Sequence, residues 1–179
     1  MAIDGCTSTF AEMATVILPE YMASLRSELA TARPLSSFCK AAIGIRSVLS
    51  ELGRKNDFSG CYVLVREGKP FYVGISRTVV QRLRQHLMGK THFDASLAYR
   101  MATNKTGHKG HKMRRADAMQ DPAFLDAFRD AQADIRAGSV AFIEILNPLE
   151  LHLFEAYCAM ELDTRVEYIS DTLTSFCLT

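Results

Sequence analysis

The sequence predicts an α/β domain of the α+β kind, with a small, mainly antiparallel three-stranded sheet flanked by helices and an N-terminal helical extension. Residues 61–65 and 71–73 are β-rich runs separated by the turn residues 67–70, which is typical of a hairpin. Residues 139–146 predict a third strand. Several other apolar stretches follow a helical period, so helices are expected to cover this sheet.

Helices separated by proline residues are predicted in the segment 1–56, over residues 9–18, 19–31 and 36–52. Pro19 stands at a helix start, where its missing N–H costs nothing. The predicted faces are apolar and carry no obvious chemistry. We expect this extension to pack against a second domain at 57–179, to form a homodimer or to bind a protein partner.

The rest of this domain is predicted to form helices joined by one basic loop. Thr78 is a good helix cap, Gly89 a good helix end, and Pro148 opens the last helix. The helices are expected over residues 78–88, 94–102, 122–136 and 148–162, and a mobile loop over 104–115, within a basic insertion at 103–138.

Composition excludes some classes of protein. No stretch approaches the roughly 18 uninterrupted apolar residues of a membrane helix, and none has the pattern of a cleaved signal. The five cysteines are scattered and form no CxxC pair, so neither a zinc framework nor a set of disulfides is indicated. We expect reduced thiols and a cytoplasmic protein.

The net charge of +1 conceals a basic segment. Arg77 to Arg115 holds ten Lys or Arg against the single acid Asp94, a formal charge of +9, which leaves −8 for the remainder. A polyanion partner is one explanation, and a solvated basic face is the other. His108 and His111 within this segment have no accompanying third ligand, so phosphate contact or solvation is favoured over zinc.

The predicted helix 78–88 carries an apolar stripe with Arg82 and His86 at its margin. Because these two residues are four apart, they lie one above the other, where a charge can stay hydrated and still face a pocket. Taken alone, they are better explained as a surface pair at a helix boundary. The stripe consists of Val79, Val80, Leu83 and Leu87.

Glu155 projects from the centre of a narrow apolar stripe formed by Leu151, Cys158 and Leu162 on the last predicted helix. Burying an unpaired carboxylate is costly, so Glu155 is expected to meet a cation. That cation is either a metal ion or a core arginine.

Taken together, these positions resemble the motifs of the GIY-YIG nuclease family. That family has a hairpin with two tyrosine motifs, a helix with arginine and histidine four apart, a third strand, and a later helix with a metal-binding glutamate. The matching residues are Gly60-Cys61-Tyr62, Tyr72-Val73-Gly74-Ile75-Ser76, Arg82-Leu83-Arg84-Gln85-His86 and Glu155.

The resemblance implies a role for each of five residues. Glu155 would hold one Mg²⁺ ion, for which Mn²⁺ can substitute, and Arg82 would stabilise charge on the phosphate in the transition state. Tyr72 would contact a phosphate. Tyr62 would act as general base or orient water, and His86 would assist proton transfer, with the division between these two left open.

The resemblance also implies a DNA endonuclease of the restriction, phage-defence or repair type, with RNA not excluded as substrate. The alternative is a catalytically weak DNA-binding module that acts with a partner protein. Two residues depart from the family pattern, Cys61 for isoleucine and Ser170 where asparagine is common. The expected substrate contacts are Gly74, Ser76, Arg77, Arg84, Lys105, Lys109, Lys112 and Ser170.

Overall fold

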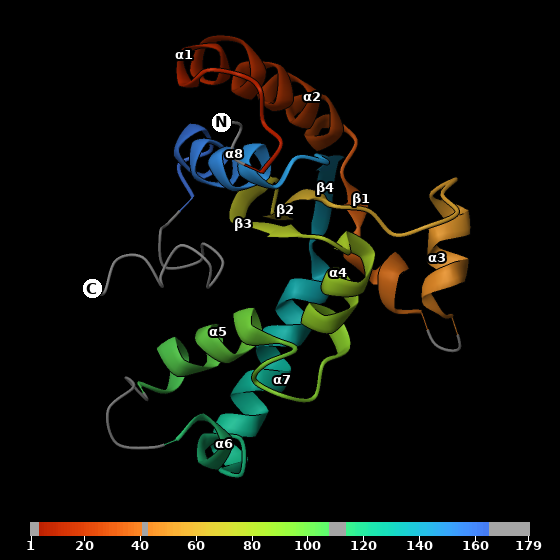
Figure 1. The fold of residues 1–179 in the computed structure, drawn as a ribbon. Coiled ribbons are helices and arrows are strands. Elements are labelled where there is room, and N and C mark those ends of the chain that lie inside the picture. Colours follow the sequence, from red (N-terminus) through yellow and green to blue (C-terminus); the bar gives the residue numbers. More distant parts are fainter. Residues whose placement is uncertain (1–3, 41–42, 108–113, 165–179) are drawn as a thin grey trace. The chain divides into compact units, whose positions relative to one another are not determined.

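The computed structural model describes residues 4–40, 43–107 and 114–164. The chain forms two compact units, which we call the sheet unit and the helical unit (Figure 1). The sheet unit consists of Met1–Arg33, Asn56–Val79 and Ser139–Thr179, and the helical unit of Pro34–Lys55 and Val80–Gly138. The N-terminal extension is thereby divided between the two units.

The sheet has four strands in the order β1-β4-β2-β3. β2 (Gly60–Arg66) pairs antiparallel with both β3 (Lys69–Ser76) and β4 (Ser139–Glu144). The predicted α+β class and the mainly antiparallel sheet are confirmed. The prediction of three strands is wrong by one, because β1 (Arg33–Pro34) has only two residues and so carries no alternating pattern.

A tight turn joins β2 to β3. Glu67 and Gly68 have φ angles of 51° and 75°, and positive φ at both central residues is typical of two-residue hairpin turns. The turn is therefore shorter than predicted, because Pro70 already lies in β3. The pairing register shifts between Leu64 and Val65.

Side chains of the sheet alternate between two faces, and one of these faces forms the core of the sheet unit. Helices α2 (Leu18–Ala30) and α8 (Pro148–Glu161) cover that face (Figure 1). The opposite face carries Tyr62, Leu64 and Tyr72, all fully buried. The core cluster includes Met22, Leu25, Cys61, Val63, Val65, Val73, Ala141, Ile143, Leu151, Phe154 and Cys158.

The N-terminal helices are continuous rather than broken at Pro19. α1 (Phe10–Glu12) leads into a π-helical turn, η1 (Met13–Ile17), and then directly into α2. The Leu18 N–H donates to the Met13 carbonyl, five residues back. This wider turn comes just before Pro19, where the chain loses one N–H donor, so the helix passes the proline and the predicted break is wrong.

Helices dominate the helical unit. α5 and α7 lie side by side (Figure 1), and Asp121 caps α7 by accepting a hydrogen bond from the Phe124 N–H at 2.9 Å. Within the described part of the chain this unit holds η2 (Leu35–Cys39), α3 (Ile45–Glu51), α5 (Ser96–Thr106), α6 (Arg115–Ala118) and α7 (Pro122–Ala137), and α4 (Val79–Met88) enters it from the sheet unit.

The predicted single helix over residues 36–52 is wrong. A 3₁₀ helix, η2, ends at Cys39, and α3 starts only at Ile45. The backbone turns extended at Lys40 (ψ 140°) and Gly44 (ψ 171°), so the helical hydrogen bonds cannot run through. Apolar residues at a helical spacing therefore belong to two separate helices.

Helix α5 extends further than predicted, because Asn104 and Lys105 are helical and Gly107 ends the helix with a φ of 69°. The predicted loop over 104–115 thus begins later, and its residues 108–113 lie outside the described part of the chain. Among the helices that the structure describes, none combines the length and the apolar character needed to cross a membrane.

Candidate active site

The two hairpin tyrosines pack against each other on the sheet face opposite Cys61. Tyr62 in β2 and Tyr72 in β3 are both fully buried, with ring centroids 6.0 Å apart and planes at 40°. The strand register places Tyr62 opposite Gly74, two residues from Tyr72, so the tyrosines are diagonal neighbours on one face. The structure therefore brings these two predicted residues together.

Gly74 makes room for both rings. A Cβ atom at this position would lie 2.6 Å from the Cζ and Oη atoms of Tyr62 and 2.8 Å from Cε1 of Tyr72. Such distances are far below van der Waals contact. Close packing of the tyrosines thus requires glycine here, whatever contact Gly74 makes with a substrate.

A cavity of about 380 Å³ lies in the sheet unit beside the end of β3. Two predicted substrate contacts, Ser76 and Arg77, line it. Ser59 and His152 were not predicted, although His152 lies on α8 one turn before Glu155. Their hydroxyl, imidazole and guanidinium groups can bind phosphate or sugar oxygens above an apolar wall. That wall is formed by Ile75, Leu146, Pro148 and Leu151.

Glu155 lies on the buried side of α8, as its spacing predicted. Asn147 caps this helix by accepting hydrogen bonds from the Leu149 and Glu150 N–H groups at 2.9 and 3.1 Å. Glu155 itself is 0% exposed, between the buried side chains of Phe154 and Cys158 along the same face. A carboxylate is thus fixed at an apolar helix surface within the sheet unit.

The surroundings of Glu155 are compatible with a hard divalent cation. Burial, together with the neighbouring Cys158 and Glu155, raises the pKa of the Cys61 thiol well above its ordinary value. Cys61 therefore stays protonated and is a poor metal ligand. Within the described residues no group of three or more His, Cys, Asp or Glu side chains is placed to hold a metal. A single carboxylate that shares Mg²⁺ with water and a phosphate fits this donor set.

The guanidinium of Arg82 is held in a fixed position by neutral groups. It donates to the Asp94 carbonyl at 3.0 Å, the Ser96 hydroxyl at 2.8 Å and the Gln85 side-chain amide oxygen at 3.4 Å. None of these acceptors carries a negative charge, so they orient the side chain without neutralising it. A partly buried, oriented cation of this kind is suited to bind an anion.

His86 lies one turn beyond Arg82 on α4 and is 0% exposed. The prediction that it stays hydrated at the edge of the helix is therefore wrong. α7 packs over this turn, where Gln132 donates to the His86 backbone carbonyl at 3.3 Å. Burial, and then the positive charges of Arg82 and Arg100, lower the pKa of His86 well below its ordinary value. At neutral pH the imidazole is therefore uncharged, and its lowered pKa makes it a weak proton acceptor.

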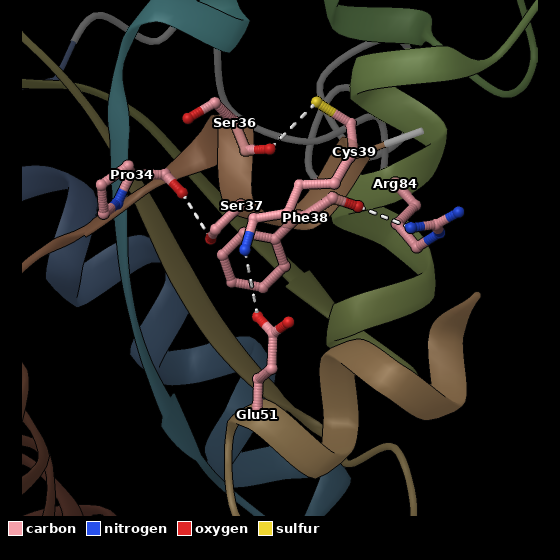
Figure 2. A network of polar contacts seen from close by, with 8 residues as sticks. Pro34, Ser36, Ser37, Phe38, Cys39, Glu51 and Arg84 are labelled. Atoms are coloured by element: carbon pink, nitrogen blue, oxygen red, sulfur yellow. Dashed lines mark hydrogen bonds and ion pairs between the residues drawn. The ribbon is translucent and has the colours of Figure 1, made fainter. Parts of the chain in front are cut away.

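Arg84 points away from Arg82 and has a partner of its own. It donates to the Phe38 carbonyl at 2.6 Å and so joins α4 to η2 within the helical unit (Figure 2). Other contacts stabilise η2 itself, including the hydrogen bond from Ser37 to the Pro34 carbonyl at 2.7 Å (Figure 2). Arg84 thus has a structural contact, and its contact with a substrate stays a prediction.

Of the remaining predicted substrate contacts, only Lys105 lies in the part of the chain that the structure describes. Lys105 on α5 forms an exposed ion pair with Asp130 on α7 at 2.9 Å. Lys109 and Lys112 lie outside the described residues, as does Ser170. His108 and His111 lie outside them as well.

Phenol, guanidinium and imidazole groups are all suited to phosphodiester chemistry. Tyr62 and Tyr72 belong to the sheet unit, and Arg82 and His86 to the helical unit. Residues 58–117 match the family model of the GIY-YIG catalytic domain. This part of the chain is a GIY-YIG catalytic domain, which implies a nuclease-type phosphodiesterase with a nucleic-acid substrate. The predicted resemblance is thereby confirmed.

The matched segment includes Tyr62, Tyr72, Arg82 and His86 and ends before Glu155. The family generally uses a divalent metal ion. No curated protein and no solved structure matches the chain significantly.

Proposed function

We propose that the protein is a Mg²⁺-dependent endonuclease that hydrolyses phosphodiester bonds in DNA, with residues 57–179 as the nuclease domain. The observation that carries this proposal is the state of Arg82. Its guanidinium is oriented by three neutral acceptors and keeps its charge, one helical turn from the uncharged imidazole of His86. A fixed cation that keeps its charge can stabilise the negative charge that develops on a phosphate diester during hydrolysis.

In the proposed reaction, the oxygen of a water molecule attacks phosphorus while the bond from phosphorus to the leaving oxygen breaks. The attacking water gives up its proton to the phenolate of Tyr62 or to His86, and the leaving oxygen takes up a proton from a solvent water molecule. Negative charge accumulates on the phosphate oxygens at this point, and Arg82 stabilises it with a forked donor. Tyr72 holds a phosphate oxygen, and Ser76 and Arg77 bind the neighbouring backbone along the cavity beside β3.

Glu155 is the proposed metal ligand. Its carboxylate is the hard oxygen donor that Mg²⁺ prefers, and the protonated thiol of Cys61 does not compete. When bound, the ion would lower the pKa of water or stabilise the leaving oxygen. One carboxylate binds Mg²⁺ weakly without a substrate, so we expect metal affinity to rise when DNA is present.

Cleavage of supercoiled plasmid by the pure full-length protein tests the proposal. We expect nicked or linear product with Mg²⁺, none with EDTA, and none from Glu155→Ala even in Mg²⁺. The matched control is Glu161→Ala on the same helix, because Glu161 is exposed and pairs only at the surface with Arg26. This control should cut like the wild type.

Three outcomes contradict the proposal. Equal cleavage by Glu155→Ala and the wild type would mean a different metal site or a contaminating nuclease. Cleavage of RNA with no cleavage of DNA would reject the substrate. DNA binding without any cleavage would favour the DNA-binding module.

A further inference from the structure

Three aromatic side chains form a continuous surface in the helical unit, between α4 and the start of α5. The rings of His92 and Phe93 have centroids 4.0 Å apart, and those of His92 and Tyr99 are 5.8 Å apart. The guanidinium of Arg115 lies over the Tyr99 ring at 5.8 Å. We call His92, Phe93, Tyr99 and Arg115 the aromatic surface.

The aromatic surface is exposed at one end and anchored at the other. Phe93 is 74% exposed, an unfavourable position for a large apolar ring. Tyr99, half-buried, packs against the fully buried Phe124 of α7, with centroids 5.0 Å apart. A rigid row of rings therefore leads from the core of the helical unit out to solvent.

The turn that carries Phe93 is held in place by several hydrogen bonds. The Thr91 hydroxyl donates to the Asp94 carboxylate at 2.8 Å, and the Ala95 N–H donates to the Thr91 carbonyl at 3.0 Å. Arg82 donates to the Asp94 carbonyl at 3.0 Å. The exposed ring is thus presented by a well-ordered turn, and the proposed catalytic arginine is bonded to that same turn.

The aromatic surface belongs to a basic segment of the sequence. It lies within the segment from Arg77 to Arg115, whose formal charge is +9. The carboxylate of Asp94, the only acid of that segment, is bonded to Thr91. Exposed aromatic rings among basic side chains are the elements that bind unpaired nucleic-acid bases, by stacking and by attraction of the backbone.

We propose that the aromatic surface stacks unpaired bases, so that the substrate is DNA that is single-stranded or carries a single-stranded flap next to the cleaved bond. This inference rests on the proposed nuclease function and specifies its substrate. Bases in an intact duplex are stacked on each other and offer no free face to Phe93. A ligand on this surface also contacts the turn that orients Arg82, which links recognition of an unpaired base to the catalytic residue.

Fluorescence anisotropy of the full-length protein in EDTA tests the inference without cleavage. The probes are labelled oligothymidylate and a labelled duplex of the same length. We expect Phe93→Ala to weaken binding of oligothymidylate about tenfold and binding of the duplex less than about twofold, because only the single strand loses a stacking contact. The matched control is Phe10→Ala on α1, where Phe10 is 76% exposed. It should change neither affinity.

A second variant gives a direct signal. The chain contains no tryptophan, so Phe93→Trp introduces the only indole at the exposed end of the surface, and its fluorescence can be excited separately from that of the six tyrosines. We expect it to bind oligothymidylate at least as well as the wild type, with its fluorescence quenched by stacked bases. Dextran sulfate, a polyanion without bases, should leave the fluorescence unquenched.

The inference is overturned if Phe93→Ala binds oligothymidylate like the wild type, if it weakens single strand and duplex equally, or if Phe10→Ala behaves in the same way. Equal quenching by dextran sulfate would also reject stacking. These outcomes are separate from a failure of the nuclease proposal. A protein that stacks bases but cuts nothing in Mg²⁺ would retain the aromatic surface and lose the proposed reaction.

Discussion

The two units hold their candidate site residues in different ways. In the sheet unit, the rings of Tyr62 and Tyr72 are fully buried and pack against each other, with Gly74 leaving room for them, and Glu155 is fully buried as well. In the helical unit, the guanidinium of Arg82 is positioned by hydrogen bonds to neutral acceptors. Packing is enough to position a neutral ring. A buried permanent charge needs polar partners, and neutral partners leave that charge available to a ligand.

Substitutions in the two units should therefore affect folding and activity in different proportions. A residue held by packing affects folding and activity together when it is changed. A charge held by neutral acceptors can be removed with less damage to the fold, because Gln85 and Asp94 are only partly buried and their oxygens can accept hydrogen bonds from water instead.

Replacement of Arg82 should have the largest effect on catalysis and a small effect on folding. We expect Arg82→Ala to lower kcat by about 10²–10³-fold, because a preorganised donor to the developing charge is lost. Arg82→Lys should recover little, since a single ammonium lacks the forked geometry. Steady-state cleavage rates and thermal melting measure the two effects.

Two control variants separate charge from positioning in that experiment. Ser96→Ala removes one acceptor of Arg82 and keeps the cation, so we expect a smaller loss of kcat than for Arg82→Ala. Arg129→Ala removes an exposed arginine on α7 and should leave the rate unchanged. If Ser96→Ala and Arg82→Ala were equally inactive, the role of Arg82 would be to hold the turn rather than to bind phosphate.

Gly74→Ala should damage folding and activity together, as expected for packing. Its Cβ would lie 2.6 Å from the Tyr62 ring, so the two strands or the ring must move. Overpacking of this kind costs about 1–3 kcal/mol of unfolding free energy. Urea denaturation measures it, with Gly44→Ala as control, because nothing lies within 4 Å of a Cβ at Gly44. A stable but inactive Gly74→Ala would point instead to a direct substrate contact.

His86 combines both kinds of environment, since it is buried by packing and faced by charges. Its pKa is lowered in the folded protein by burial, by Arg82 on its own helix and by Arg100 on α5. Below the ordinary histidine pKa of about 6.5, the unfolded chain takes up a proton that the folded protein does not. Stability is therefore complete above that pH and is lost as the pH falls below it.

Unfolding free energies at pH 7.5 and 5.5 test this assignment. We expect the wild type to lose more stability on acidification than His86→Gln, which cannot take up the proton. His152→Gln replaces an exposed histidine of α8 and should retain the wild-type dependence. Identical slopes for the wild type and His86→Gln would show that His86 is protonated in the folded protein.

The sequence predicted the parts of the molecule that follow a periodic pattern. The β-rich runs predicted the strands that carry Tyr62 and Tyr72, whose role came from the family motif. The helical period placed Glu155 on a buried face, because burial repeats with backbone geometry. The pattern could not show that α7 covers His86, since that contact joins residues far apart in the chain. The π-helical turn before Pro19 was missed for a related reason, because it depends on the whole helix continuing past the proline.

Lys105 should show the smallest effect, because its charge already has a partner. Asp130 lies 2.9 Å from the Lys105 ammonium, and both side chains are exposed, so the pair is weak and competes with phosphate for the same cation. We expect Lys105→Ala to weaken DNA binding by less than about twofold and to lower the salt slope by at most about 0.9, the value for one phosphate contact. In an Asp130→Ala background the lysine is released, and the same substitution should cost more. Anisotropy titrations over a range of salt concentrations measure this difference. Equal costs in both backgrounds would mean that Asp130 does not restrain Lys105, and that the basic face is as available to DNA as its formal charge suggests.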